Sequence, residues 1–136
     1  MATPIEDLAV YVQTGGHGTI GTDLFRDHLP ESPDACIAIL SAPGGPSEWA
    51  FGSEALKWER PNVSIWIRKA RFEKDLCRTF ANTVYRYVGR IQAETINGTV
   101  YHFAHMLGAP FWLKDDQNER PIFIMNVELE KEVASS

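Results

Sequence analysis

The stretch from residue 72 to residue 89 constrains the fold most, because its apolar and polar residues recur with the period of an α-helix. Its apolar side, which runs on into the following residues, consists of Leu76, Phe80, Val84, Tyr87, Val88 and Ile91. The opposite side is polar and mostly basic, with Arg71, Lys74, Arg78, Asn82, Arg86 and Arg90. An amphipathic helix buries its apolar side against the core. The pattern therefore predicts the main core helix.

Other segments carry strand and helix signals. Residues 35–40 form a continuous apolar run. In 63–67, Val63, Ile65 and Ile67 alternate with Ser64 and Trp66, and 121–130 reads as a final strand with Phe123, Met125, Val127 and Leu129 on one face. Asn97-Gly98 predicts a tight hairpin over 94–103, and Thr3 with Pro4 opens a short helix over 3–14. We therefore expect an α+β fold: a mixed or antiparallel β-sheet packed against one long amphipathic helix and a short N-terminal helix, with a long inter-strand loop.

The length of 136 residues fits a single domain over 1–136. Within it we expect an extended loop over about 42–61 and a flexible C-terminus over 132–136. No apolar run approaches the roughly 20 residues that span a bilayer. The N-terminus lacks the basic and then apolar layout of a signal peptide. These features predict a soluble protein that is cytosolic where it is made and has no membrane partner.

Motifs for catalysis, cofactors or metals are weak. The glycines of 16–21 match the letters of a dinucleotide-binding loop, but a helix precedes them where that loop needs a strand. The two cysteines, Cys36 and Cys77, lie in apolar surroundings without a metal-ligand spacing. We therefore predict no catalytic, cofactor-binding or metal-binding residue, no cofactor, and no enzymatic activity.

The charge is distributed unevenly along the chain. Residues 1–56 carry a net charge of -7, residues 57–90 carry +6, and residues 91–136 carry -4, which together give the formal charge of -5. The basic helix side can be a solvated surface or a subunit interface. As the interface hypothesis, we predict that a set of basic residues meets acidic residues of a neighbouring copy: Arg68, Lys69, Arg78, Arg86 and Arg90.

The expected loop over 42–61 is longer than an ordinary hairpin connection and unusually rich in large apolar residues. These are Trp49, Phe51, Leu56 and Trp58. They can fold back onto the domain or form a patch that another chain covers. We include them among the candidate residues for a contact with a neighbouring subunit or connector.

Several segments, taken in order, resemble a known family. They are Ile5–Tyr11, Gly18–Phe25, Ala55–Val63, Asn97–Tyr101, Gly108–Phe111 and Asn118–Pro121. Together they are similar to the bacteriophage minor capsid family, whose members are tail-completion or tail-terminator proteins at the head–tail junction. The chain is more aromatic than the family pattern at Trp66 and at Phe111-Trp112.

The resemblance implies a virion structural protein. It implies a closed homo-oligomeric ring, a hexamer, that ends the tail tube and joins it to the head connector in the neck. DNA would pass through an acidic lumen without specific binding. The expected location is the virion tail or neck, with assembly in the host cytoplasm.

Three other functions are open at this point. One is a head-completion or connector-adaptor protein of the neck. A second is a small α/β enzyme that uses His102, His105 or the Asp115-Asp116 loop. A third is a regulatory binding module that is a monomer or a dimer.

Overall fold

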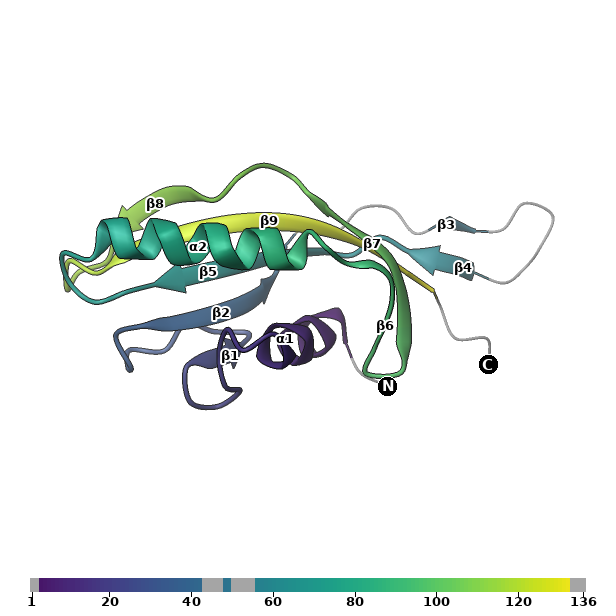
Figure 1. The fold of residues 1–136 in the computed structure, drawn as a ribbon, viewed down its shortest axis with the longest axis horizontal. Helices are drawn as coiled ribbons and strands as arrows, with labels where there is room; N and C mark the ends of the chain where they lie inside the picture. The colour runs from purple at the N-terminus through teal and green to yellow at the C-terminus, as the bar shows by residue number, and fades with distance from the viewer. Residues whose placement is uncertain (1–2, 43–47, 50–55, 133–136) are drawn as a thin grey trace.

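The computed structural model describes residues 3–42, 48–49 and 56–132. Two helices and nine strands are present in these ranges (Figure 1). In chain order they are α1 (Pro4–Thr14), β1 (Leu24–Arg26), β2 (Cys36–Ser41), β3 (Glu48–Trp49), β4 (Leu56–Glu59), β5 (Asn62–Arg68), α2 (Lys74–Val88), β6 (Gln92–Ile96), β7 (Thr99–Met106), β8 (Phe111–Asp115) and β9 (Pro121–Glu132). Neither helix is long and apolar enough to cross a membrane.

Strand β9 organises the sheet. It pairs with β5 and β4 along one edge and with β7 and β8 along the other, in each case antiparallel. Beyond β5 the sheet continues to β2 and β1, and only the β1–β2 pair is parallel. The prediction of a long final strand is confirmed, and this strand is the centre of the sheet.

The alternation of β9 sets the core. Phe123, Met125, Val127 and Leu129, which share one face of the strand, are at most 2% exposed. They join buried residues from α1 and α2 in one cluster, so both helices cover the same face of the sheet (Figure 1). Burial of these side chains drives the folding of the domain.

The expected fold class is wrong. Strands contain twice as many residues as helices, so the fold is mostly β rather than a sheet packed against one long helix. The short helix α1 contributes fully buried Leu8, Ala9 and Val12 to the same core. The sequence pattern predicted too few strands, because short strands such as β1, β3 and β8 have too few residues to show a two-residue period.

Helix α2 buries only part of the apolar side that the sequence predicts, since Val84 and Val88 are buried as expected but Leu76 is not. Its buried positions are Cys77, Ala81, Val84 and Val88, whereas Leu76 is 51% exposed. Small residues such as Cys77 and Ala81 let the helix approach the sheet closely. Leu76 is thereby turned toward solvent.

The segment expected as one loop over 42–61 contains two strands. Trp58 and Glu59 of β4 pair with Glu132 and Lys131, because β9 continues beyond the end of β5 and offers a free edge there. Strand β3 then pairs with β4. Residues 43–47, 50–55 and 133–136, which include most of the expected flexible C-terminus, lie outside the described residues.

A buried carboxylate fixes α1 to the β6–β7 hairpin. Asp7 is completely buried, and its two oxygens accept hydrogen bonds from the Tyr101 hydroxyl at 2.5 Å and the Asn97 side-chain amide at 3.1 Å. Burial and the bond to Asp7 raise the pKa of Tyr101 far above its ordinary value, so this hydroxyl stays a donor. The pair therefore compensates for burying the carboxylate.

We predict that Tyr101→Phe lowers the free energy of unfolding by about 1–3 kcal/mol, because the buried Asp7 loses one of its two side-chain donors. Chemical denaturation monitored by fluorescence measures the change. Tyr85→Phe is the matched control, since Tyr85 is only half-buried. Equal losses in the two variants would contradict the role given to Asp7.

Candidate interaction surfaces

The structure separates the basic residues that the sequence grouped together. Arg68 is 2% exposed, and its guanidinium donates to the backbone carbonyls of Asp34 at 2.9 Å and Pro33 at 2.7 Å. It therefore serves its own subunit. Lys69 is half-buried, with its ammonium 4.0 Å from the centre of the Phe80 ring.

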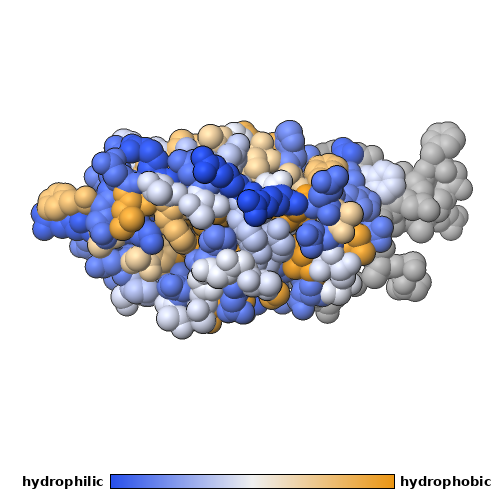
Figure 2. Space-filling view, in the orientation of Figure 1, coloured by the Kyte–Doolittle hydropathy of each residue, from blue (hydrophilic) through white to orange (hydrophobic). Residues whose placement is uncertain are grey.

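Arg78, Arg86 and Arg90 are exposed on or just after α2, where Figure 2 shows a strongly hydrophilic strip across the front of the molecule. Arg78 pairs with Asp75 at 2.7 Å within the same helix. Arg86 and Arg90 form no ion pair with another residue of the described ranges. All three arginines are exposed, although Arg78 is already paired within its own helix.

The aromatic candidates of 42–61 are described only in part. Leu56 and Trp58 belong to β4 and Trp49 to β3, while Phe51 lies outside the described residues. Trp58 is half-buried, and its indole N–H is buried without a hydrogen-bond partner among the described groups. An unpaired buried donor is costly, so this residue is a point where a further acceptor would stabilise the structure.

A cluster of charged residues lies beside β4, at the C-terminal end of β9. Both ring nitrogens of His102 face carboxylates, Nδ1 at 2.7 Å from Glu130 and Nε2 at 3.2 Å from Glu132. Hydrogen bonds to Glu130 and then Glu132 raise the pKa of His102. Burial opposes ionisation of Glu130, but the bonds from His102 and Arg60 outweigh it and lower the pKa of that carboxyl. The cluster favours a charged imidazolium linking β7 to the end of β9.

The main feature that sequence reasoning missed is β8. Its three apolar residues are exposed, Phe111 by 49%, Trp112 by 44% and Leu113 by 37%. The strand pairs with β9 alone, so its other edge has no strand partner within the described ranges. The apolar run after Pro110 was the available signal, but three residues cannot be distinguished from a loop.

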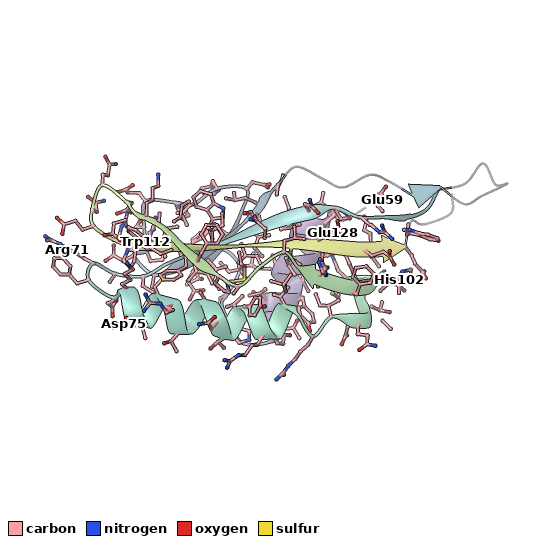
Figure 3. All side chains as sticks on the ribbon, turned by 90° about the horizontal axis from the view of Figure 1, so that it is seen from above. Glu59, Arg71, Asp75, His102, Trp112 and Glu128 are labelled. Carbon is pink, nitrogen blue, oxygen red and sulfur yellow. The ribbon has the colours of Figure 1, made fainter. Side chains whose placement is uncertain are left out.

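Trp112 is held in place although it is exposed. The Lys74 ammonium lies 3.9 Å from the centre of its ring, and its indole N–H donates to Asp115 at 3.1 Å. Figure 3 shows Trp112 beside the first turn of α2, at the opposite end of the molecule from His102. A fixed, exposed tryptophan loses little conformational entropy when a partner covers it.

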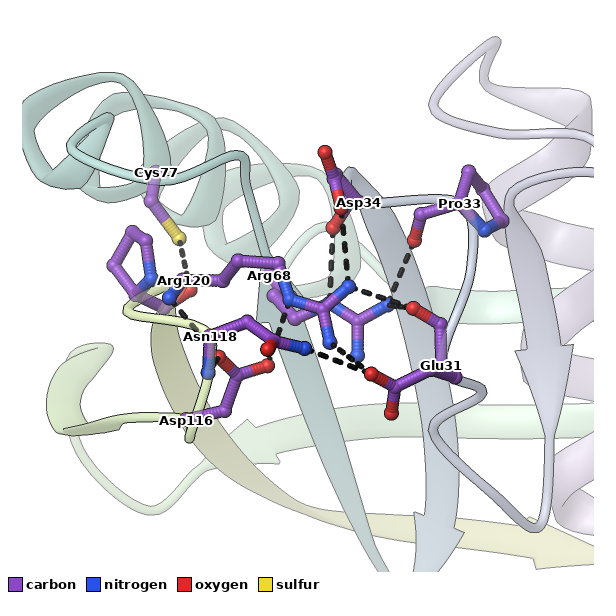
Figure 4. Close-up of polar contacts among 9 residues, drawn as sticks. Glu31, Pro33, Asp34, Arg68, Cys77, Asp116, Asn118 and Arg120 are labelled. Atoms are coloured by element: carbon purple, nitrogen blue, oxygen red, sulfur yellow. Dashed lines mark hydrogen bonds and ion pairs between the residues drawn. The ribbon is translucent and has the colours of Figure 1, made fainter.

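A buried arginine fixes the turn that carries β8. The Arg120 side chain is 5% exposed and donates to Asp116 at 2.8 Å, to the Glu31 carbonyl at 2.6 Å and to Asp34 at 3.1 Å (Figure 4). Arg120 thus ties residues 31–34 to the β8–β9 turn, and Arg68 ties the same residues to β5. We call this group the arginine clamp.

The pKa of Asp116 is lowered by its hydrogen bonds within the arginine clamp. Burial alone would raise this pKa, but backbone N–H groups of Arg120 and Asn118 and the Arg120 guanidinium lower it. A carboxylate with a lowered folded-state pKa stabilises the fold above its unfolded pKa and loses this contribution as the pH falls through the folded pKa.

The candidate catalytic groups have structural roles. Asp115 binds Trp112, Asp116 binds Arg120, and His102 binds two glutamates. Burial raises the pKa of Cys36, and raises that of Cys77 to about 11, so neither thiol is a ready nucleophile. Among the described residues, no group of three His, Cys, Asp or Glu side chains could hold a metal ion.

An exposed apolar edge strand and an exposed arginine surface are typical of proteins that bind other proteins. The family model described as bacteriophage tail terminator protein matches residues 11–133, so the chain belongs to this family. The resemblance seen in the sequence is thereby confirmed, and the family's role is structural. The search of curated proteins finds no match.

We predict that Arg120→Met lowers the free energy of unfolding by about 3 kcal/mol, because it leaves Asp116 and the Glu31 carbonyl without their buried donor. Arg71→Met is the control, since Arg71 and Glu119 form an exposed pair for which about 0–1 kcal/mol is expected. Denaturant titration of both variants measures the difference. A cost for Arg120→Met no larger than that for Arg71→Met would exclude the arginine clamp as a stabilising element.

We predict that His102 titrates above the ordinary pKa of histidine and that Glu132→Gln moves its pKa downward, because one of the two carboxylate partners is lost. Because the folded pKa is raised, the stabilisation is complete below the unfolded pKa and is lost as the pH rises through the folded one. NMR titration measures the pKa, and unfolding of His102→Gln beside the parent from pH 5.5 to 9 measures the stability. An unshifted His102, or a stability difference that grows with pH, would contradict the assignment.

Proposed function

We propose that this tail-terminator protein forms a closed ring, a hexamer, that ends the tail tube and joins it to the head connector. DNA passes through the lumen without specific binding. The observation that carries the proposal is the family match over residues 11–133. It favours the terminator role over that of a head-completion or connector-adaptor protein. The exposed β8 strand supports a role in assembly, because such an edge is normally protected in a monomeric protein.

A closed ring joins a different patch of each subunit to the next one, so the two patches must be complementary. Arg78, Arg86 and Arg90 supply a basic patch, and the net charges of -7 and -4 in the flanking parts of the sequence supply the acidic counterpart. Such complementarity directs orientation and partner choice more than it adds affinity. Arg68 is excluded from this patch by its burial. Lys69 is half-buried and contacts Phe80 of its own subunit, and Arg78 likewise pairs with Asp75, so Arg86 and Arg90 are the least engaged members.

The aromatic residues of the 42–61 segment form a second contact in this proposal. Trp49, Phe51, Leu56 and Trp58 dock onto a neighbouring subunit or the connector. Trp58 supports this, because it is only half-buried within its own subunit and leaves part of its side chain for a partner to cover. Tryptophan is also among the residues that dominate binding energy at protein interfaces.

The whole chain acts as a single domain in this proposal. It is built into the tail or neck of the virion after assembly in the host cytoplasm. An acidic lumen lets DNA slide, because like charges prevent tight binding to phosphate. We propose neither a cofactor nor a catalytic step.

We predict that the charge reversals Arg78→Glu, Arg86→Glu and Arg90→Glu, combined in one chain, weaken ring formation by roughly tenfold or more, because the basic patch would repel its acidic partner. Native mass spectrometry and sedimentation velocity measure the oligomer, with and without tail tubes. Arg26→Glu is the control, since Arg26 is exposed but lies on β1. Unchanged ring formation by the triple variant would remove the basic patch from the interface.

A further inference from the structure

The face of the sheet opposite the helices carries a second apolar surface. Ile124 lies between the core residues Phe123 and Met125 of β9, so it points away from both helices (Figure 1). Trp66 of β5 and Phe111 of β8 both pair with Ile124, and residues paired across strands share a face. Phe111 is 49% exposed and Trp66 is half-buried, whereas Ile124 between them is 8% exposed. We call these three residues the apolar row, and no helix of the described ranges covers it.

This helix-free face changes from apolar to acidic along β9. Every second residue of the strand points to it, and these residues are Ile122, Ile124, Asn126, Glu128, Glu130 and Glu132. Lys114 of β8 is the exposed cation at the apolar end. At the other end, Arg60 and His102 offset part of the acidic charge through ion pairs with the last two glutamates. Glu128 is half-buried and forms no ion pair with another described residue, and the exposed His105 lies across from it on β7.

The outer side of α2 changes in the same direction, from apolar to basic. The exposed residues opposite its buried side recur at spacings of three and four, and they are Leu76, Thr79, Thr83 and Arg86. Leu76 is 51% exposed, and Arg90 continues the basic end just after the helix. Arg86 and Arg90 form no ion pair with another residue in the described part of the chain. This outer side therefore begins with an apolar residue and ends with two arginines.

The two surfaces agree in direction and in length. Helix α2 and strand β9 run in the same direction within one copy (Figure 1). With a rise of about 1.5 Å per residue, Leu76 and Arg86 lie about 15 Å apart along the helix. With a rise of about 3.3 Å per residue, Ile124 and Glu128 lie about 13 Å apart along the strand. When two copies stack in the same orientation, the apolar ends meet each other while arginine meets glutamate.

We infer that the outer side of α2 in one copy packs on the helix-free sheet face of a second copy. Leu76 then lies on the apolar row, and Arg86 lies beside Glu128. Because this contact joins two different faces, it is heterologous and propagates from copy to copy until a ring closes. The inference rests on the proposed ring and identifies the acidic partner of its basic patch.

The other charges on the outer side of α2 are compatible with this contact. Asp75 is exposed but pairs with Arg78, so the start of the outer side is close to neutral and holds an acid at the lysine end of the sheet face. Glu94 is exposed and lines the same groove as Arg90, where it offsets part of the basic charge. Arg86 is therefore the arginine on which the match with the acidic end depends most.

The first test exchanges the two charges. Arg86→Glu alone and Glu128→Arg alone are each expected to weaken association roughly tenfold or more, because each places like charges together. In the double variant Arg86→Glu/Glu128→Arg, every contact again joins opposite charges, so association is expected to recover most of this loss. Sedimentation velocity over a range of concentrations measures association, and thermal unfolding confirms that each variant folds.

The matched control combines Arg86→Glu with Glu6→Arg, which has the same net charge as the double variant. The Glu6 side chain is 42% exposed and belongs to α1, on the side of the sheet that the helices cover. No recovery is expected in this control. An absent recovery in the double variant, or an equal recovery in the control, would overturn the inference.

The second test does not depend on weakening the protein. Copies carrying Thr83→Cys on the outer side of α2 are mixed with copies carrying His105→Cys on the helix-free face, and a short bismaleimide cross-linker is added. The native Cys36 and Cys77 are buried and do not compete. A product that joins the two kinds of copy is expected. In the control mixture Thr14→Cys, exposed at the end of α1, replaces His105→Cys. Cross-linking only between copies of one kind, equally in both mixtures, or in neither mixture would overturn the contact.

The two proposals fail in different ways. If the parent protein forms rings but the charge exchange gives no recovery and the cross-link does not form, the helix-on-sheet contact is wrong and the ring stands. If the parent protein stays monomeric at all concentrations and on tail tubes, the ring is wrong, and the absence of cross-links then refutes the contact as well.

Discussion

The backbone pairing of β9 is the constraint on which the rest of the structure depends. Its twelve residues reach past every neighbouring strand, so four strands share its two edges. One face of the strand, which carries Phe123 and Met125, is part of the surface on which both helices pack. The extra length at its C-terminal end gives β4 a partner, and its N-terminal end carries β8. A single strand thus positions both β4 and β8.

The two ends are stabilised by different charged groups. At the β8 end, the buried Arg120 joins the β8–β9 turn to residues 31–34, and its pairing with Asp116 makes this connection sensitive to acid. At the β4 end, His102 links Glu130 and Glu132 in a more exposed setting that is sensitive to alkali. The two ends respond oppositely to pH because an acidic residue, Asp116, titrates at the β8 end and a basic residue, His102, titrates at the β4 end. Arg120 holds the turn that carries β8, and His102 joins β7 to the C-terminal end of β9.

Much of the fold was predictable because a regular spacing of apolar residues over a long segment indicates a helix or a strand. The hairpin at Asn97-Gly98, the helix capped by Thr3 and the alternating strand over 121–130 all have a local physical cause. The fold class was nevertheless wrong, because short strands lack a period and the closeness of α2 to the sheet depends on small residues such as Ala81. Among the candidate site residues, Arg68 shows the same limit: sequence gives its charge but not its burial.

The sequence by itself determined the family, the position of the main elements and the uneven charge, since each of these depends on local residue order or on composition. Only the tertiary structure decided which arginines face solvent and which are buried, because burial depends on segments distant in the chain, such as residues 31–34 against Arg68 and Arg120. It also decided that Phe111–Asp115 lies at a free edge. A strand lies at a free edge when no other strand pairs with one of its sides. The strands that pair with β9 come from parts of the chain far apart in sequence, so local residue order does not show where the free edge lies.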